Sequence, residues 1–479
     1  MMDNDTTDRS SPPEAPLPAR SRSGCQQCRR RRRKCDEQHP CCTACLTRNL
    51  PCNWEREKTT RKHSYHRRLH QNKDFAVPEE MAPFTTIIAT PTAPMVDTLM
   101  VHFSEVSPLW LTIGGRKKRS DCLDIIMPCI TRSPLVLNCV LAVAAGDLSK
   151  YQPASADMAT LSCGFYGQAV AGIRSALNTE LVDSASLASD HADEILLAIL
   201  LLCVHEVVNF THSDRVLLHI NAAALICYNR SFSAAPEPRL RRLLFELFCY
   251  IFTLTAFSHG RNLRLSLAPQ IFNSPFLQGT QEQGMLIGKS LDLFYFIFRI
   301  SVIISKTSCG ELDPAAILEL NAIESELSGW RTSRLENEDL EGADEYITSE
   351  LYRLACLIHV KKILNPQLPY QSPAIQEFLS EFISNLDRLP SDSPANSVLC
   401  WPLVVAGMAA VTARHRRLIT TRLRKNHETW RSDILSKSIQ LLGEKWKQEN
   451  CSEGTADIPC LSSLPPVICN EPFVYPIVL

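Results

Sequence analysis

Seven of the chain's twenty cysteines lie in one stretch of 28 residues, CQQCRRRRRKCDEQHPCCTACLTRNLPC (25–52). Six of them follow the pattern C-x2-C-x6-C twice, with six residues between the two copies: Cys25, Cys28, Cys35, Cys42, Cys45 and Cys52. Each C-x2-C places two sulfurs on one tight turn, where they can hold one tetrahedral zinc ion. The spacing therefore predicts a metal half-site that occurs twice.

Six thiolates can serve two zinc ions only if some of them are shared. Two tetrahedral ions need eight sulfur positions, and six sulfurs fill eight if two of them bridge both ions. Residues 23–54 contain few apolar side chains, so zinc binding, about 10–16 kcal/mol in small zinc peptides, would supply the folding free energy. Cys41 is assigned no metal, because using it in place of Cys42 destroys the repeat. A redox-active thiol cluster and another kind of zinc module are the alternatives.

Six consecutive cations, RRRRRK (29–34), separate the second and third of these cysteines. Residues 20–70 hold 15 Lys+Arg and 4 Asp+Glu, or +11, and the rest, with 35 cations and 47 anions, carries −12. Such an asymmetry indicates contact with nucleic acid or a membrane through one end. Arginine matches O6 and N7 of guanine in the major groove, so the run favours double-stranded DNA. A nuclear import signal, together with RKHSYHRR (61–68), is the plainer interpretation, and the two are compatible.

The remaining composition is that of a foldable globular protein, with 45% hydrophobic and 21% charged residues among 479. The first residues contain no apolar run that could serve as a secretory signal, so we expect reduced thiols or zinc ligands and no disulfide framework. The most apolar stretches, 195–204, 243–257 and 291–305, fall short of the roughly 18 to 20 residues that cross a bilayer. We therefore expect no membrane partner.

Composition and periodicity divide the chain into a disordered leader, a zinc module, a basic and then Pro-containing linker, a helical domain and a tail: 1–22, 23–54, 55–94, 95–450 and 451–479. In the helical domain, apolar residues recur at three- and four-residue spacing, which predicts an all-α fold of about ten to twelve helices. Residues 53–94 show no sustained heptad repeat, so a coiled-coil dimer is not supported and homodimer formation is left open.

The cysteine stretch resembles the fungal zinc binuclear cluster family, in which six cysteines hold two zinc ions. The resemblance is carried by the cations after the second cysteine, by Lys34-Cys35-Asp36 and by Pro40 in the central loop. It implies that Cys25 and Cys42 bridge the two ions. Cys28 and Cys35 would then complete one ion, and Cys45 and Cys52 the other.

The same resemblance implies how the module reads DNA. Bases of a CGG-type triplet are read in this family from the third and fourth positions after the second cysteine, which are Arg31 and Arg32 here. Members usually carry Lys at the fourth position, so Arg32 is a departure. The other cations are expected to contact phosphate, which supplies affinity but little sequence information: Arg29, Arg30, Arg33, Lys34 and Arg48.

Residues 95–450 resemble the fungal-specific transcription factor domain that usually follows this cluster. The resemblance is carried by MVDTLMVHFSEVSPLW, PLVLNCVLAVAAGDLS, HINAAALICYNR and CWPLVVAGMAA (400–410). It implies a small zinc-stabilised DNA-binding module with a large all-α regulatory domain, located in the nucleus and acting with the transcription machinery. It favours an activator, with a metabolic or secondary-metabolite gene cluster as one target.

Catalytic motifs are missing from the helical part of the sequence. His205-Glu206 begins like a zinc-protease helix but lacks the second histidine, and Cys203 and His205 are two apart, so a helix does not turn them toward each other. We therefore expect no enzyme. Two other functions are kept as alternatives: a metabolite-sensing helical protein that the cluster tethers to chromatin, and a zinc-dependent protein-interaction scaffold.

Overall fold

The chain forms two units in the computed structural model, Met1–Ala76 and Val77–Leu479. In the first unit the structure describes residues 25, 27–28, 31, 35–36, 38, 41–48, 50 and 52. In the second it describes residues 92–113, 116–151, 156–182, 191–209, 213–231, 233, 235, 237–278, 284–287, 290–307, 312–330 and 340–452. The predicted leader lies outside these residues, as do most of the predicted linker and most of the predicted tail.

The first unit has a core made of cysteines. Five thiols are buried against one another, and four partly buried residues pack around them: Cys25, Cys28, Cys35, Cys42 and Cys45, then Cys41, Ala44, Leu50 and Cys52. The short helix α2 (Thr43–Leu46) follows Cys42, and the backbone N–H of Thr43 donates to Asp36 Oδ2 at 3.0 Å. A core of this kind holds together through what its sulfurs bind, since it buries almost no apolar carbon.

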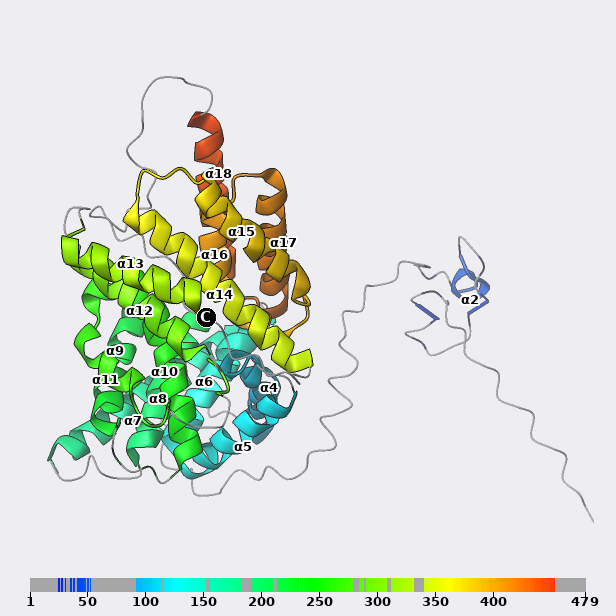
Figure 1. Ribbon diagram of the computed structural model, residues 1–479. Helices are drawn as coiled ribbons and strands as arrows, with labels where there is room; N and C mark the ends of the chain where they lie inside the picture. Colours follow the sequence, from blue (N-terminus) through cyan, green and yellow to red (C-terminus); the bar gives the residue numbers. More distant parts are fainter. Residues whose placement is uncertain are drawn as a thin grey trace, which may run out of the picture. The chain divides into compact units, whose positions relative to one another are not determined.

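The second unit is all helical in the part that the structure describes, as the sequence predicts (Figure 1). Its fifteen α-helices are α4 (Ala93–Leu111), α5 (Arg116–Arg132), α6 (Pro134–Tyr151), α7 (Ala156–Val182), α8 (His191–Asn209), α9 (Ser213–Arg230), α10 (Pro238–His259), α11 (Ala268–Phe272), α12 (Leu291–Lys306), α13 (Pro314–Gly329), α14 (Leu340–Leu364), α15 (Pro373–Arg388), α16 (Cys400–Ala409), α17 (Ala413–Trp430) and α18 (Asp433–Ser452). Three 3₁₀ helices join them: η3 (Gly260–Asn262), η4 (Leu265–Leu267) and η5 (Pro394–Val398). The expected ten to twelve helices were thus too few.

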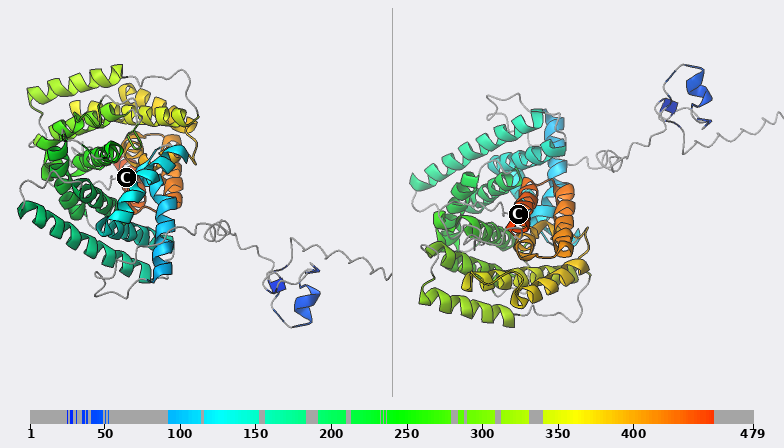
Figure 2. Two further views of the ribbon diagram at one scale, coloured as in Figure 1. Left: turned by 90° about the horizontal axis from the view of Figure 1, so that it is seen from below. Right: turned by 90° about the horizontal axis from the view of Figure 1, so that it is seen from above.

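Helix α8 lies in the core of this unit. Its sequence is apolar on every side, a pattern typical of a helix covered all round, and every residue from 195 to 208 is buried. It packs against α6, α9 and α10, and it also contacts α18 from the far end of the chain. The first helix, α4, packs against α6, so the first and last helices of the unit share one core. Figure 2 shows the helices from two further sides. None of the described helices is long and apolar enough to cross a membrane.

Residues 400–430 are divided between two helices, although the apolar spacing runs on between them. Helix α16 ends at Ala409, and α17 begins at Ala413 with Thr412 as its N-cap. The hydroxyl of Thr412 accepts from the backbone N–H of His415 at 3.2 Å and satisfies one of the free donors of the new helix. The apolar spacing continues across this break, so periodicity alone does not reveal it.

One buried ion pair joins the starts of two helices. Arg241 on α10 donates from Nε and Nη2 to the carboxylate of Asp193 on α8, at 3.0 and 2.7 Å. Its Nη1 also donates to the carbonyl of Ser233 at 2.9 Å. The arginine is fully buried and the aspartate 3% exposed. A buried charge must be paired to be tolerated, so each partner depends on the other.

We predict that Asp193→Asn lowers the free energy of unfolding by about 3–5 kcal/mol, because it leaves the Arg241 guanidinium buried without a counter-charge. The matched control is Arg132→Ala, which removes a pair with Glu194 in which the arginine side chain is 62% exposed. That change is expected to cost about 0–1 kcal/mol. Urea unfolding of the full chain compares the two, and equal losses would contradict the assignment.

Candidate metal centre and nucleic-acid interface

The six cysteines of the repeat come together in two groups of four. Within each group all sulfur atoms lie within 4.8 Å of one another: Cys25, Cys28, Cys35 and Cys42 in one, and Cys25, Cys42, Cys45 and Cys52 in the other. Cys25 and Cys42 belong to both groups. Cys41 belongs to neither, and its sulfur lies 3.8 Å from the carbonyl oxygen of Cys42.

The sulfur–sulfur distances fit a zinc site. The Sγ atoms of Cys25 and Cys42 are 3.6 Å apart, as are those of Cys25 and Cys45 and those of Cys28 and Cys42. Four sulfurs about 2.3 Å from a tetrahedral zinc ion stand about 3.8 Å from one another, whereas a disulfide requires about 2.05 Å. An all-sulfur donor set of this size is typical of structural zinc.

Local backbone structure sets the positions of these sulfurs. Cys42 is the N-cap of α2 and Cys45 lies one turn further on, so both thiols project from the same end of the helix. The N–H of Cys42 also points at the Cys52 sulfur, at 3.3 Å. Backbone donors of this kind favour the thiolate, which is the form that binds zinc.

The thiols hold negative charge unequally. Burial raises the pKa of Cys28 to about 12, and hydrogen bonds to Cys42 and Cys25 act in the same direction. Burial also opposes charge on Cys25, but bonds from the Cys28 backbone and from the Cys45 and Cys42 thiols outweigh it, and its pKa falls to about 6. The thiolate is therefore favoured at Cys25 over Cys28. A metal ion that binds here must displace protons from the other thiols.

Two of the seven predicted DNA-contacting residues are described. Arg31 is exposed, and its backbone N–H donates to the carbonyl of Gln27 at 3.1 Å, which continues the helical turn through Cys28. Arg48 is exposed two residues after the end of α2, and its guanidinium reaches the Ala44 carbonyl only at 3.5 Å. The other five lie outside the described residues: Arg29, Arg30, Arg32, Arg33 and Lys34.

Two family models match the chain. The fungal Zn(2)-Cys(6) binuclear cluster domain matches residues 23–62, which contain both sulfur groups. The fungal specific transcription factor domain matches residues 98–459, about three quarters of the chain and nearly all of the helical unit. The chain belongs to this family of fungal transcription factors. Both resemblances are thereby confirmed.

Relatives of this family match over part of their length. A Zn(2)-C6 fungal-type transcription factor, afumD of Aspergillus fumigatus, is 32% identical over 163 residues, which are 32% of this chain and 39% of the relative. An uncharacterized transcriptional regulatory protein of Schizosaccharomyces pombe is 39% identical over 49 residues, which are 10% of this chain and 5% of that protein. The chain thus aligns with well under two thirds of either relative. No solved structure matches it significantly.

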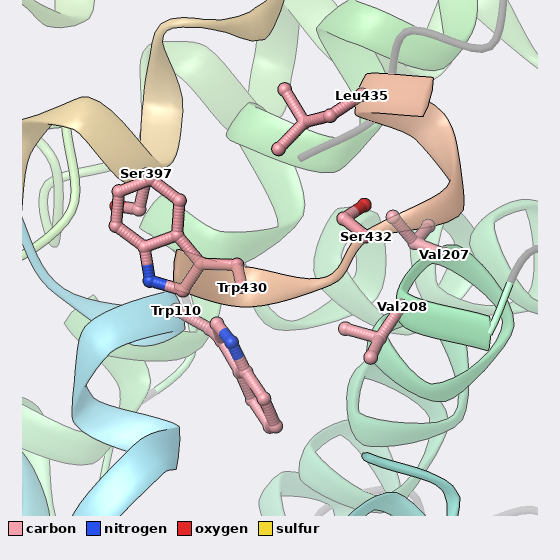
Figure 3. Close-up of a pocket in the computed structure, with 7 residues that line it drawn as sticks. All are labelled: Trp110, Val207, Val208, Ser397, Trp430, Ser432 and Leu435. Carbon is pink, nitrogen blue, oxygen red and sulfur yellow. The ribbon is translucent and has the colours of Figure 1, made fainter. Parts of the chain in front are cut away.

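A small pocket lies where α4, α8, η5 and the turn between α17 and α18 meet (Figure 3). The lining residues are Trp110, Val207, Val208, Ser397, Trp430, Ser432 and Leu435. The cavity volume that water can occupy is about 30 Å³, roughly twice the volume that one buried water molecule needs. Trp430 Nε1 and Ser397 Oγ are buried without a hydrogen-bond partner in the described chain. The pocket therefore suits a few bound waters that satisfy these atoms.

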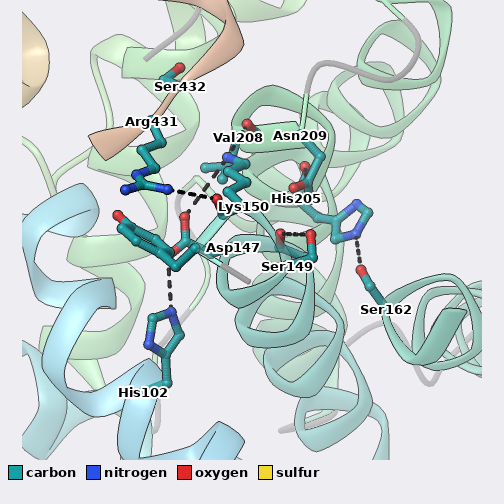
Figure 4. A network of polar contacts seen from close by, with 12 residues as sticks. His102, Asp147, Ser149, Lys150, Ser162, His205, Val208, Asn209, Arg431 and Ser432 are labelled. Atoms are coloured by element: carbon teal, nitrogen blue, oxygen red, sulfur yellow. Dashed lines mark hydrogen bonds and ion pairs between the residues drawn. The ribbon is translucent and has the colours of Figure 1, made fainter. Parts of the chain in front are cut away.

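A buried polar network runs beside this pocket (Figure 4). Asp147, fully buried on α6, lies 2.9 Å from His102 Nε2 on α4 and 3.8 Å from Lys150 Nζ. Lys150 donates to the carbonyl of Val208 on α8 at 2.5 Å, and its own carbonyl accepts from Arg431 Nη1 at 2.9 Å. Arg431 has a left-handed backbone (φ 46°), and these contacts hold it there. The network joins α4, α6 and α8 to the turn between α17 and α18.

His205 has a structural partner that the sequence did not suggest. Its Nε2 is 2.8 Å from the hydroxyl of Ser162 on α7, and that hydroxyl donates its proton to the Ala142 carbonyl at 2.9 Å. His205 Nε2 must then be the donor to Ser162, so the ring is not a base for the serine. Both side chains are about 95% buried. The pair joins α7 to α8. Proteins of these families are transcription factors, which are not enzymes.

We predict that His205 makes the domain sensitive to acid. Burial lowers its pKa to about 4, whereas an unfolded chain titrates near 6.5, so the unfolded state binds the proton first as pH falls. The stability that depends on neutral His205 is complete above about pH 6.5 and is lost toward pH 4, about 3 kcal/mol in all. His205→Gln keeps a donor for Ser162 and does not titrate. The free energy of unfolding, measured between pH 7 and 4, should fall less steeply for this variant, with a slope difference of up to about 1.4 kcal/mol per pH unit. Parallel slopes would exclude His205 as the source of the acid sensitivity.

Proposed function

We propose that this chain is a nuclear activator of transcription that reads a CGG-like triplet of double-stranded DNA through two zinc ions held by six cysteines. One observation carries the proposal: the six sulfurs form two groups of four that share Cys25 and Cys42. This is the arrangement that two tetrahedral ions require from six ligands. Bound zinc would fix the fold of a unit that has no apolar core.

The ligand assignment follows from the two groups. Cys25 and Cys42 would bridge both ions, Cys28 and Cys35 would complete the first, and Cys45 and Cys52 the second. The S···S distances of 3.6 Å support this assignment. So does the hydrogen bond from the Cys42 backbone to the Cys52 sulfur.

Zinc content tests the assignment. The native chain should hold two zinc ions, and Cys28→Ala should lose the folded first unit together with DNA binding, because one ion loses one of its four ligands. Cys41→Ala is the matched control, a neighbouring thiol that belongs to neither group, and should keep both ions. Elemental analysis of the full chain measures its zinc content. Far-UV circular dichroism checks the helical domain, whose signal should persist in both variants. A Cys28→Ala chain with two zinc ions and native DNA binding would refute the ligand set.

Base reading is assigned to Arg31 and Arg32, and phosphate contact to the other five cations: Arg29, Arg30, Arg33, Lys34 and Arg48. The exposed side chain of Arg31 supports its part, since no hydrogen bond or ion pair to a described residue holds it back. Arginine can donate to both O6 and N7 of guanine, and each such pair contributes about 1–3 kcal/mol of discrimination.

Selection from random oligonucleotides at a stated salt concentration tests this division. The native chain should enrich a CGG-like triplet, once for a monomer and twice at fixed spacing for a dimer. Arg31→Ala with Arg32→Ala should remove the preference while most non-specific affinity remains. Arg48→Ala, the control, should weaken binding equally on all sequences and reduce the salt slope by about 0.9. An unchanged preference in the double variant would place base reading elsewhere.

The remaining parts of the proposal concern partners and organisation. We assign 23–54 to DNA binding and 95–450 to regulation, with 1–22, 55–94 and 451–479 as leader, linker and tail. Recruitment of the transcription machinery, a homodimer on paired sites and control of a metabolic or secondary-metabolite gene cluster are the expected context. The two families support this context. The chromatin-tethered metabolite sensor and the zinc-dependent interaction scaffold stay as alternative predictions.

A further inference from the structure

Helix α17 is strongly basic, although the chain outside residues 20–70 is acidic. It carries six Lys or Arg residues and one carboxylate, that of Glu428, while the chain outside 20–70 has 47 anions against 35 cations. The helix lies at the outer edge of the domain in Figures 1 and 2 (orange), and it packs on α16, α18 and η5. Its cations divide into two kinds.

The first kind turns inward and stabilises the fold. Arg422 donates to the carbonyls of Leu386 and Leu389, at 2.8 and 2.9 Å, and ties the end of α15 to α17. Arg416 donates to the Ala410 carbonyl at 2.8 Å and to Glu449 at 2.6 Å. Lys425 bonds to Ser391. These three side chains are already engaged within the domain.

The second kind turns outward and is not engaged. Arg414, Arg417 and Arg424 are exposed, and none makes an ion pair or side-chain hydrogen bond to any described residue. Their spacing of three and seven residues places them on one side of the helix, opposite the buried Ile419 and Leu423. We call these three arginines the outer arginine face. It extends over about 15 Å of helix, at 1.5 Å per residue.

We propose that the outer arginine face is a second DNA-contacting surface, which binds backbone phosphates without regard to sequence. One strand of a duplex carries a phosphate about every 3.4 Å along its axis, so a face of about 15 Å meets about four phosphates. Three unengaged guanidinium groups at that spacing suit such a row, since arginine pairs readily with phosphate. The inference rests on the DNA binding of the family and does not depend on the triplet that the cluster reads.

An acidic protein segment is the other partner that would suit this charge. A protein partner needs a buried apolar centre within a polar rim, and the face offers none. The described large apolar side chains that are exposed lie elsewhere: Leu46, Tyr151, Leu218, Leu225, Ile317 and Leu318. A surface of charge without apolar anchors favours the phosphate backbone, where charge alone supplies the affinity.

The test compares the full, zinc-loaded chain on duplexes of about 15 and about 45 base pairs centred on one CGG triplet. The native chain should show a steeper dependence of affinity on salt with the long duplex, by about 2.7 in the log–log slope for three phosphate contacts. The variant R414A/R417A/R424A should lose this gain and bind the short duplex as the native chain does. The variant R414K/R417K/R424K should keep it, because phosphate contact needs only the charge.

The matched control removes three exposed arginines outside α17 that make no ion pair with a described residue, through Arg174→Ala, Arg239→Ala and Arg264→Ala. It changes net charge equally and should keep the gain. An equal loss in this control, or no gain in the native chain, overturns the proposal. A face variant that binds both duplexes normally but no longer binds poly-glutamate also overturns it, in favour of an acidic protein partner. Arg31→Ala with Arg32→Ala keeps the gain while triplet preference is lost, so failure of cluster reading is distinguishable from failure of this surface.

Discussion

The first unit depends on the sharing of sulfurs. Six cysteines can complete two tetrahedra only when two of them serve both, and Cys25 and Cys42 are the two that lie in both groups. The other features of this unit serve that arrangement. The C-x2-C turns bring sulfurs into pairs, α2 directs Cys42 and Cys45 to the same point, and the Cys42 backbone supports Cys52. With five cysteines as its buried core, the unit folds around bound metal where larger domains fold around apolar carbon.

The helical domain, in contrast, is stabilised by buried apolar side chains. It is large enough to bury a continuous apolar core, and α8 is covered on nearly every side. Buried polar side chains in its interior contact one another, as Asp193 does with Arg241 and Asp147 with His102. Each such pair joins helices that are distant in sequence, so each selects one packing of the helices over others that bury similar area. The two units therefore have separate sources of stability.

Much of this could be predicted from the sequence, for physical reasons that differ between the two units. Cysteine ligands lie close together in the chain and repeat, so spacing alone selected the six sulfurs and set Cys41 aside. Helix type followed from apolar periodicity, but helix ends did not, because the period runs through the break between α16 and α17. The contact of His205 with Ser162 joins residues 43 positions apart, and no local pattern encodes such a pairing. The sequence drew attention to Cys203 beside His205, whereas the fold turned the histidine toward α7.

The basic module and the rest of the chain carry opposite net charge. The net charge of −1 conceals a basic module of +11 and a remainder of −12, and an acidic body is repelled by a duplex that its own first unit binds. Repulsion acts within about 8–10 Å at physiological salt, so it matters only for the face of the domain nearest the DNA. On α17, three of six cations make no ion pair or side-chain hydrogen bond to a described residue, whereas Arg416 pairs with Glu449 and Arg422 donates to the Leu386 carbonyl. If stability alone governed the helix, outward positions would need no particular sign. Three outward positions carry arginine and one carries a carboxylate, Glu428, and this excess of positive charge suits a polyanion outside the domain.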